Sequence, residues 1–166
     1  MANLIRGEAL AADDGWIQIA ADADAASIPP GPVLVPLRHW LEHRAQLSAR
    51  GAPIGVWLAA DEAVESLAGQ LDGLRLIAIH FPLFSDGRGY SNARILRERI
   101  GWRGELRAIG DVLRDQLFLL RRCGFDSFAI REDRSAEDAL GSLDDFRHVY
   151  QRATADPDTP LLERRR

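Results

Sequence analysis

A loop with two glycines and an arginine follows the strongly apolar segment Leu74–Phe81. Gly87 and Gly89 flank Arg88, and Ser91 is expected to cap the helix that comes next. The N-terminus of a helix leaves backbone N–H groups unpaired and carries partial positive charge, so it can hold an anion. We therefore predict a binding site here for a phosphate, sulfate or sulfite group. The alternative is a tight glycine turn that only leads into the helix.

Charged side chains beside this loop could complete such a site. Arg94 and Arg97 lie on the predicted helix and could add bidentate contacts to an oxyanion. Alternatively, these arginines are solvated or paired with Glu98. Asp86 could orient Arg88 or act as an acid/base group.

A second acidic candidate, Asp111, comes directly after the apolar segment Leu106–Ile109 and Gly110. Asp86 and Asp111 are the two candidate catalytic residues of the sequence. Asp111 also stands where a carboxylate would cap the next helix, which explains it without any catalysis.

Other chemistry-bearing residues are better explained by structure. His39, Glu42 and His43 match the inverted zinc-protease pattern H-x-x-E-H. Helical periodicity places them opposite the apolar face, so we predict a solvated helix face and no metal. His80 ends an apolar segment and could titrate near neutral pH or be a satisfied core histidine. Cys123 follows an apolar helical pattern and is expected to be a buried, unreactive thiol.

The elements that position these residues alternate between short apolar segments and helical periods, about five times from Val33 onward. This alternation is typical of an α/β protein with a parallel sheet. The sheet could be open and doubly wound or a partial β/α barrel. In both cases ligands bind at the carboxyl ends of the strands.

Three regions are expected along the chain. Residues 1–32 form a short N-terminal β-hairpin, turning at Asp14-Gly15, and a loop. Residues 33–153 form a single α/β domain, which closes with a helix carrying Leu140 to Tyr150. Residues 154–166 form a flexible C-terminal tail.

Composition excludes several classes of protein. The chain has 166 residues, 46% hydrophobic and 28% charged, as in an ordinary globular domain. It has a net charge of −4, which argues against a nucleic-acid partner. All 21 basic residues are arginines, so Schiff-base and P-loop lysine chemistry is excluded. One cysteine, no signal peptide and no long apolar run predict a cytoplasmic protein without a membrane partner.

Three stretches of the sequence carry a family resemblance: residues 81–94, 104–116 and 122–126. Over about residues 33–149 the chain resembles the bacterial domain-of-unknown-function family numbered 934. The resemblance implies an association with assimilatory sulfite reductase, beside whose genes the family's genes commonly lie. Family members are often labelled oxidoreductases, but the chain has no cysteine pair and no dinucleotide fingerprint that would support this label.

Three hypotheses follow. The first is an accessory protein of sulfite reduction that binds the reductase, a cofactor or an oxyanion. The second is a small enzyme that acts on a sulfur or phosphate oxyanion at the same edge. In the third, the motif residues stabilise a subunit interface of a homo-oligomer. The sequence identifies no cofactor.

Overall fold

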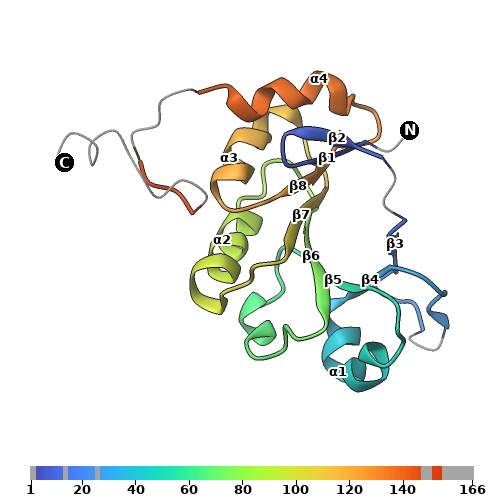
Figure 1. Ribbon diagram of the computed structural model, residues 1–166. Coiled ribbons are helices and arrows are strands. Elements are labelled where there is room, and N and C mark those ends of the chain that lie inside the picture. The colour runs from blue at the N-terminus through green and yellow to red at the C-terminus, as the bar shows by residue number, and fades with distance from the viewer. Residues whose placement is uncertain (1–2, 13–14, 25–26, 147–150, 155–166) are drawn as a thin grey trace.

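A computed structural model describes residues 3–12, 15–24, 27–146 and 151–154. The chain forms an eight-stranded sheet with the order β2-β1-β8-β7-β6-β5-β4-β3 (Figure 1). The strands are β1 Leu4–Arg6, β2 Ala9–Ala11, β3 Ile17–Gln18, β4 Val33–Pro36, β5 Ile54–Leu58, β6 Leu74–Phe81, β7 Glu105–Gly110 and β8 Ser127–Ala129.

Six strands, β3 to β8, are parallel, and from β4 onward each lies beside the strand that precedes it in the sequence. A doubly wound sheet would need a point where the strand order reverses, and this part of the sheet has none. The parallel sheet is therefore confirmed, in the form of a partial barrel: the sheet curls as half of a barrel does. It differs from five simple strand–helix units because β1 and β2 join its end in antiparallel orientation.

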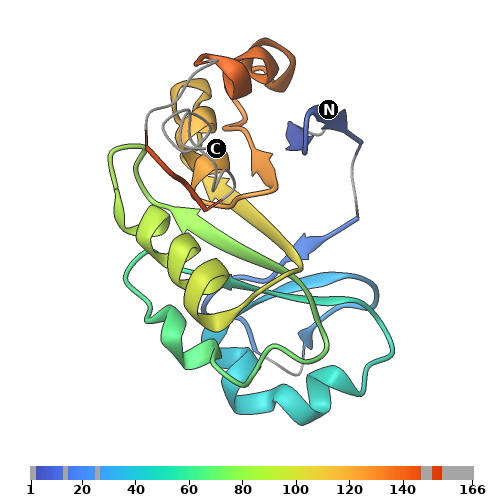
Figure 2. The same cartoon turned by 60° about the vertical axis from the view of Figure 1, so that its left-hand side comes forward.

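Helical segments connect the parallel strands along one side of the sheet (Figure 2). The connecting segments are α1 Leu37–Ser48, the 3-10 helix η2 Val64–Leu67, α2 Arg88–Arg94, the π-helix η3 Ile95–Ile100, the 3-10 helix η4 Arg114–Gln116 and α3 Leu117–Arg122. Two more, α4 Ala136–Leu140 and the 3-10 helix η5 Gly141–Asp144, follow the last strand. The connection between β5 and β6 contains only the single turn η2, and Asp61 does not cap it. Ala63 occupies the cap position, and Glu62 instead accepts the N–H of Ala59 at 2.6 Å.

Two apolar clusters lie on the two sides of the sheet. The larger one fills the space between the sheet and the helices, and Trp40, Phe81 and Phe128 are its largest fully buried side chains. The smaller one lies on the concave side and consists of Leu34, Leu76, Ala78 and Ile109, with Trp16, Trp57 and Ala129 packed against it. The inside of the curl is thus lined by apolar side chains of the protein.

The N-terminal hairpin forms at a different place from the one expected. Gly7, with a φ of +60°, lies in the turn that joins β1 to β2. The strand after Gly15 does not pair back onto this hairpin: Ile17 pairs in parallel with Val33 of β4 at the other end of the sheet. The turn prediction at Asp14-Gly15 is therefore wrong, because Gly7 already supplies the left-handed conformation that the turn requires. Asp14 itself lies outside the described residues.

Two other expectations fall partly or wholly outside the described residues. The closing helix is observed as α4 and η5, which end at Asp144, and residues 147–150 are not described. Residues 155–166 of the expected tail are likewise not described. Within the described part of the chain, no helix is both long and apolar enough to cross a membrane.

Candidate functional site at the carboxyl ends of the strands

The loop after β6 is held in place by the segment after β7. The backbone N–H of Phe84 donates to Oδ2 of Asp111 at 2.8 Å, and the side-chain amide of Gln116 donates to the carbonyl of Phe84 at 3.0 Å. Gln116 also reaches the hydroxyl of Tyr90 at 3.3 Å. The two longest motifs of the sequence therefore meet in space and form one surface. We call this surface, residues 82–87 held on residues 110–116, the loop platform.

The chain turns sharply at Gly110 so that Asp111 can reach this loop. Gly110 has a φ of +92°, and the N–H of Asp111 donates to the carbonyl of Phe81 at 2.8 Å. A Cβ atom at Gly110 would collide with that carbonyl oxygen and would lie 2.9 Å from Nε2 of His80. Only glycine fits this position without displacing β6.

Arg131, after β8, is a site residue that the sequence did not single out. Its guanidinium donates to Oδ1 of Asp111 at 2.7 Å and to both carboxylate oxygens of Asp133, at 2.6 and 3.0 Å. These carboxylates raise the pKa of Arg131, and Arg131 in turn lowers the pKa of Asp133. The signal that could have found Arg131 is the one that found Asp111: both follow the end of a parallel strand.

Asp111 does not cap the helix that follows it, contrary to the simpler of its two expected roles. The next helical segment, η4, begins after Leu113, whose N–H donates to Oε1 of Gln116 at 2.8 Å. The Asp111 carboxylate instead joins two loops, because the turn at Gly110 directs it away from the helix. Its side chain is 16% exposed in this position.

Asp86 and Arg88 form a close pair within the loop. The Arg88 guanidinium lies 2.6 Å from Oδ2 of Asp86, and the Arg88 backbone N–H donates to Oδ1 at 3.1 Å. Arg88 lowers the pKa of Asp86 to about 2, first through the side-chain hydrogen bonds and then through the backbone one. The carboxylate of Asp86 thus occupies the guanidinium and the first backbone N–H group of α2. An incoming anion would compete with it for both.

The helix begins at Arg88, so Ser91 lies inside it and does not cap its N-terminus. The predicted cap is wrong because Gly87 takes that position. Around Gly87 an added Cβ atom would meet open space. Gly89, in contrast, packs against the ring of Phe81, where an added Cβ would lie 2.5 Å from the ring.

The two arginines farther along this helix have carboxylate partners already. Arg94 is exposed and pairs with Glu98 at 3.2 Å, as the alternative to an oxyanion contact predicts. Arg97 is only 10% exposed; it donates to the carbonyls of Trp102, Gly104 and Gly124 and pairs with Asp126. Arg97 is therefore a structural residue that ties the π-helix to the starts of β7 and β8, and these bonds occupy the guanidinium that was predicted to contact an oxyanion.

Two large apolar side chains project from the loop platform into solvent. Leu83 is 61% exposed and Phe84 is 55% exposed. Leaving these two side chains in water forgoes the hydrophobic free energy that their burial would provide. Their exposure on a loop with a fixed backbone is the unusual feature of this site.

The histidine pattern on α1 differs from expectation at one residue. His39 is buried, with 4% exposure, and its Nδ1 atom has no hydrogen-bond partner. The prediction that it faces solvent is wrong, because the side of α1 that carries it packs beside Trp40 and Leu37 on the core. His43 is partly exposed. Among the described residues, no group of three or more histidine, cysteine or acidic side chains is placed to hold a metal ion.

The remaining titratable candidates are half-buried. The His80 ring contacts the edge of Trp57 at 6.2 Å between centroids, and burial lowers the pKa of His80. Cys123 is also half-buried, and burial raises the pKa of its thiol. The thiol is therefore protonated at neutral pH and is a poor nucleophile.

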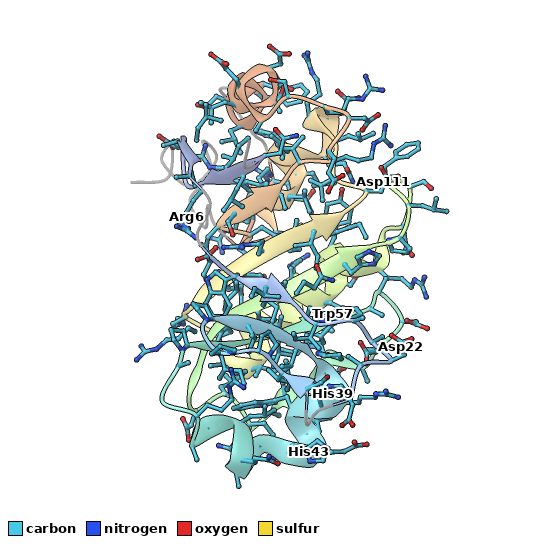
Figure 3. The ribbon with its side chains drawn as sticks, turned by 90° about the vertical axis from the view of Figure 1, so that its right-hand side faces the viewer. Arg6, Asp22, His39, His43, Trp57 and Asp111 are labelled. Carbon is cyan, nitrogen blue, oxygen red and sulfur yellow. The ribbon has the colours of Figure 1, made fainter. Side chains whose placement is uncertain are left out.

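Fold and site together define a class of protein: an α/β partial barrel whose candidate site lies at the carboxyl ends of its parallel strands (Figure 3). A family model described as a bacterial protein of unknown function, DUF934, matches residues 55–161. This match covers more than half of the chain, which therefore belongs to the DUF934 family. It begins in β5, later than the resemblance at Val33, and it contains the whole loop platform and Arg131. Searches among curated proteins and among solved structures found no match.

Proposed function

We propose that this protein is a non-catalytic accessory protein of assimilatory sulfite reduction, and that it docks on the sulfite reductase through the loop platform. The observation that carries the proposal is the exposure of Leu83 and Phe84 on a loop whose backbone is bonded to Asp111 and Gln116. Apolar groups in this setting offer a partner area to bury, and aromatic side chains contribute strongly to protein interfaces.

The fixed backbone favours docking because it lowers the entropic cost of association. A free loop would lose conformational entropy when a partner orders it, at about 1–2 kcal/mol per residue. Here Asp111 and Gln116 hold both polar backbone groups of Phe84 before any partner arrives. Binding then loses less free energy than it would with a disordered loop.

We propose sulfite reductase as the partner because the family resemblance implies an association with assimilatory sulfite reduction. The residues themselves support a binding role better than an electron-carrying one. The chain contains a single cysteine, and its half-buried thiol has a raised pKa. A redox pair of thiols or a thiolate-bound cluster therefore cannot be assembled within one copy of this chain.

The enzyme and oxyanion alternatives have weaker support. With a pKa of about 2, Asp86 is ionised at neutral pH, so it has no proton to donate and is a weak base. Arg88 and Arg94 already bind carboxylates of the chain. Sulfite or phosphate would have to displace Asp86 or Glu98 to bind there, which makes the oxyanion site a prediction that a ligand titration can test.

Binding of the purified protein to assimilatory sulfite reductase, measured by biolayer interferometry, tests the proposal. We expect the double variant Leu83→Gln, Phe84→Gln to weaken the complex at least tenfold, since two apolar side chains would no longer be buried. A matched control is Leu41→Gln on α1, which removes a 41% exposed leucine far along the chain from the loop. The control should bind like the parent.

Two outcomes would reject the proposal. One is the absence of any complex between the parent protein and the reductase. The other is a complex that the double variant and the control weaken equally, because the apolar pair would then have no special part in it. Thermal unfolding of the parent protein with sulfite, sulfate or phosphate tests the oxyanion alternative separately. A rise in Tm that Arg88→Ala abolishes would favour this alternative.

A further inference from the structure

A shallow hollow of about 650 Å³ opens on the concave side of the sheet. Gln18 of β3 lines it together with Ala129 of β8, although four strands separate β3 from β8 in the sheet order. The curl therefore brings the two ends of the parallel sheet face to face. The volume of the hollow falls in the range of small-molecule sites.

The floor of this hollow is apolar. Ile109 and Ala129 line it, and both belong to or pack against the concave apolar cluster. Trp57 packs against the same cluster from β5. A flat hydrocarbon ring placed on this floor would exchange water for apolar contact.

His80 lies beside the floor with free hydrogen-bonding capacity. It pairs with Ile109 in the register of β6 and β7, so its side chain lies on the same face of the sheet. Its Nε2 atom lies next to Gly110, which also lines the hollow. Trp57 cannot serve His80, because the indole N–H donates to the carbonyl of Ile19 at 2.8 Å. Within the described part of the chain His80 has no hydrogen-bond partner, and burial favours its neutral form, which can accept a hydrogen bond.

The charged groups around the hollow are mostly acidic. Arg131, Glu132 and Asp133 line it, and the Arg131 guanidinium is shared between Asp133 and the adjacent Asp111. The exposed Glu132 carboxylate forms no ion pair with a described residue. Asp22 lies on the same side of the molecule as Asp111 (Figure 3). The lining of the hollow thus holds one guanidinium and two carboxylates, with Asp111 next to them, and this balance of charge favours cations over oxyanions.

We infer that the hollow is a second binding site, next to the docking surface, and that it binds a small organic cation with a flat apolar ring, such as an aryl amidinium or a protonated nitrogen heterocycle. The ring lies on Ile109 and Ala129. The N–H groups of the ligand donate to Nε2 of His80 and to the carboxylate of Glu132. Gln18 supplies an amide from the opposite wall.

Benzamidine and benzoate test this inference, because they share one ring and carry opposite charges. The readout is the imidazole resonances of His80 in NMR spectra of the full chain during titration with each compound. Benzamidine should shift these resonances saturably in the millimolar range, and benzoate should leave them unchanged. Glu132→Gln should weaken benzamidine binding about two- to fivefold, as expected for loss of an exposed ion pair.

The control variant is Glu65→Gln on η2, which removes an exposed carboxylate outside the hollow. It should bind benzamidine like the parent. Equal shifts with benzoate, equal weakening in both glutamate variants, or no saturation would overturn the inference. The variant Leu83→Gln, Phe84→Gln should retain benzamidine binding, so this result and the docking result can fail separately.

Discussion

Gln116 offers the sharpest test of how the loop platform is held together. Gln116 is 7% exposed, and its side chain makes three hydrogen bonds. It accepts one from the N–H of Leu113 and donates to the carbonyl of Phe84 and the hydroxyl of Tyr90. The change Gln116→Met keeps the length of the side chain and removes all three. Each bond contributes about 1 kcal/mol net, so the variant should lose about 3 kcal/mol of unfolding free energy.

Urea denaturation and calorimetry measure this loss. For a chain of this size, a loss of about 3 kcal/mol corresponds to a fall of roughly 6 to 12 °C in Tm. The control is Gln46→Met on α1, an exposed glutamine without a hydrogen bond to any described residue, which should change the unfolding free energy by less than about 0.5 kcal/mol. Equal stability of the two variants would refute the reasoning, because the three bonds would then contribute nothing to the fold. A normal Tm combined with lost reductase binding would also refute it.

Three further predictions concern the same edge of the sheet. Gly110→Ala should cost about 1–3 kcal/mol of unfolding free energy in urea denaturation, because a Cβ atom there meets the Phe81 carbonyl at a positive φ; an unchanged midpoint would contradict this. His80 has a lowered pKa in the folded state, so the unfolded state binds its proton first, and stability falls as pH drops through the ordinary histidine value of 6.5. His80→Leu should flatten that part of the stability–pH curve, and a variant that keeps the full slope would argue against this role. In a carboxyl NMR titration, Asp86 should titrate at about 2, and Arg88→Ala should return it toward 3.8; identical midpoints in both proteins would count against the ion pair.

The layout of the sheet could be predicted from the sequence because parallel strands leave a plain pattern. Buried strands such as Leu74–Phe81 are mostly apolar, and helical periods separate them. The same pattern located the edge at which Asp111 and the loop before Arg88 meet. It could not choose between a partial barrel and a doubly wound sheet, because that choice depends on which side of the sheet each connection takes.

Individual side-chain roles were harder to predict, because they depend on contacts between distant residues. Asp111 looked like a helix cap, yet the partner that determines its position is Arg131, twenty residues later. His39 was predicted to be exposed because the apolar pattern of α1 does not show which residues elsewhere in the chain pack against this side of the helix. The hairpin was misplaced because Gly7 and Gly15 both suit a tight turn, and β4 decides which segment forms it.

The two ends of the sheet belong to neighbouring pieces of one short segment. The hairpin β1–β2 covers one end and β3 covers the other, and only five residues of sequence separate Ala11 from Ile17. β3 needs only the nearby β4, which begins at Val33, whereas the hairpin cannot join the sheet until β8 has formed, more than a hundred residues later in the sequence. The end of the sheet at β8 should therefore be covered later in folding than the end at β3. During translation β1 and β2 are made long before β8, so this pairing of high sequence separation should be slow, and until it forms the edge of β8 stays open to pairing with other chains.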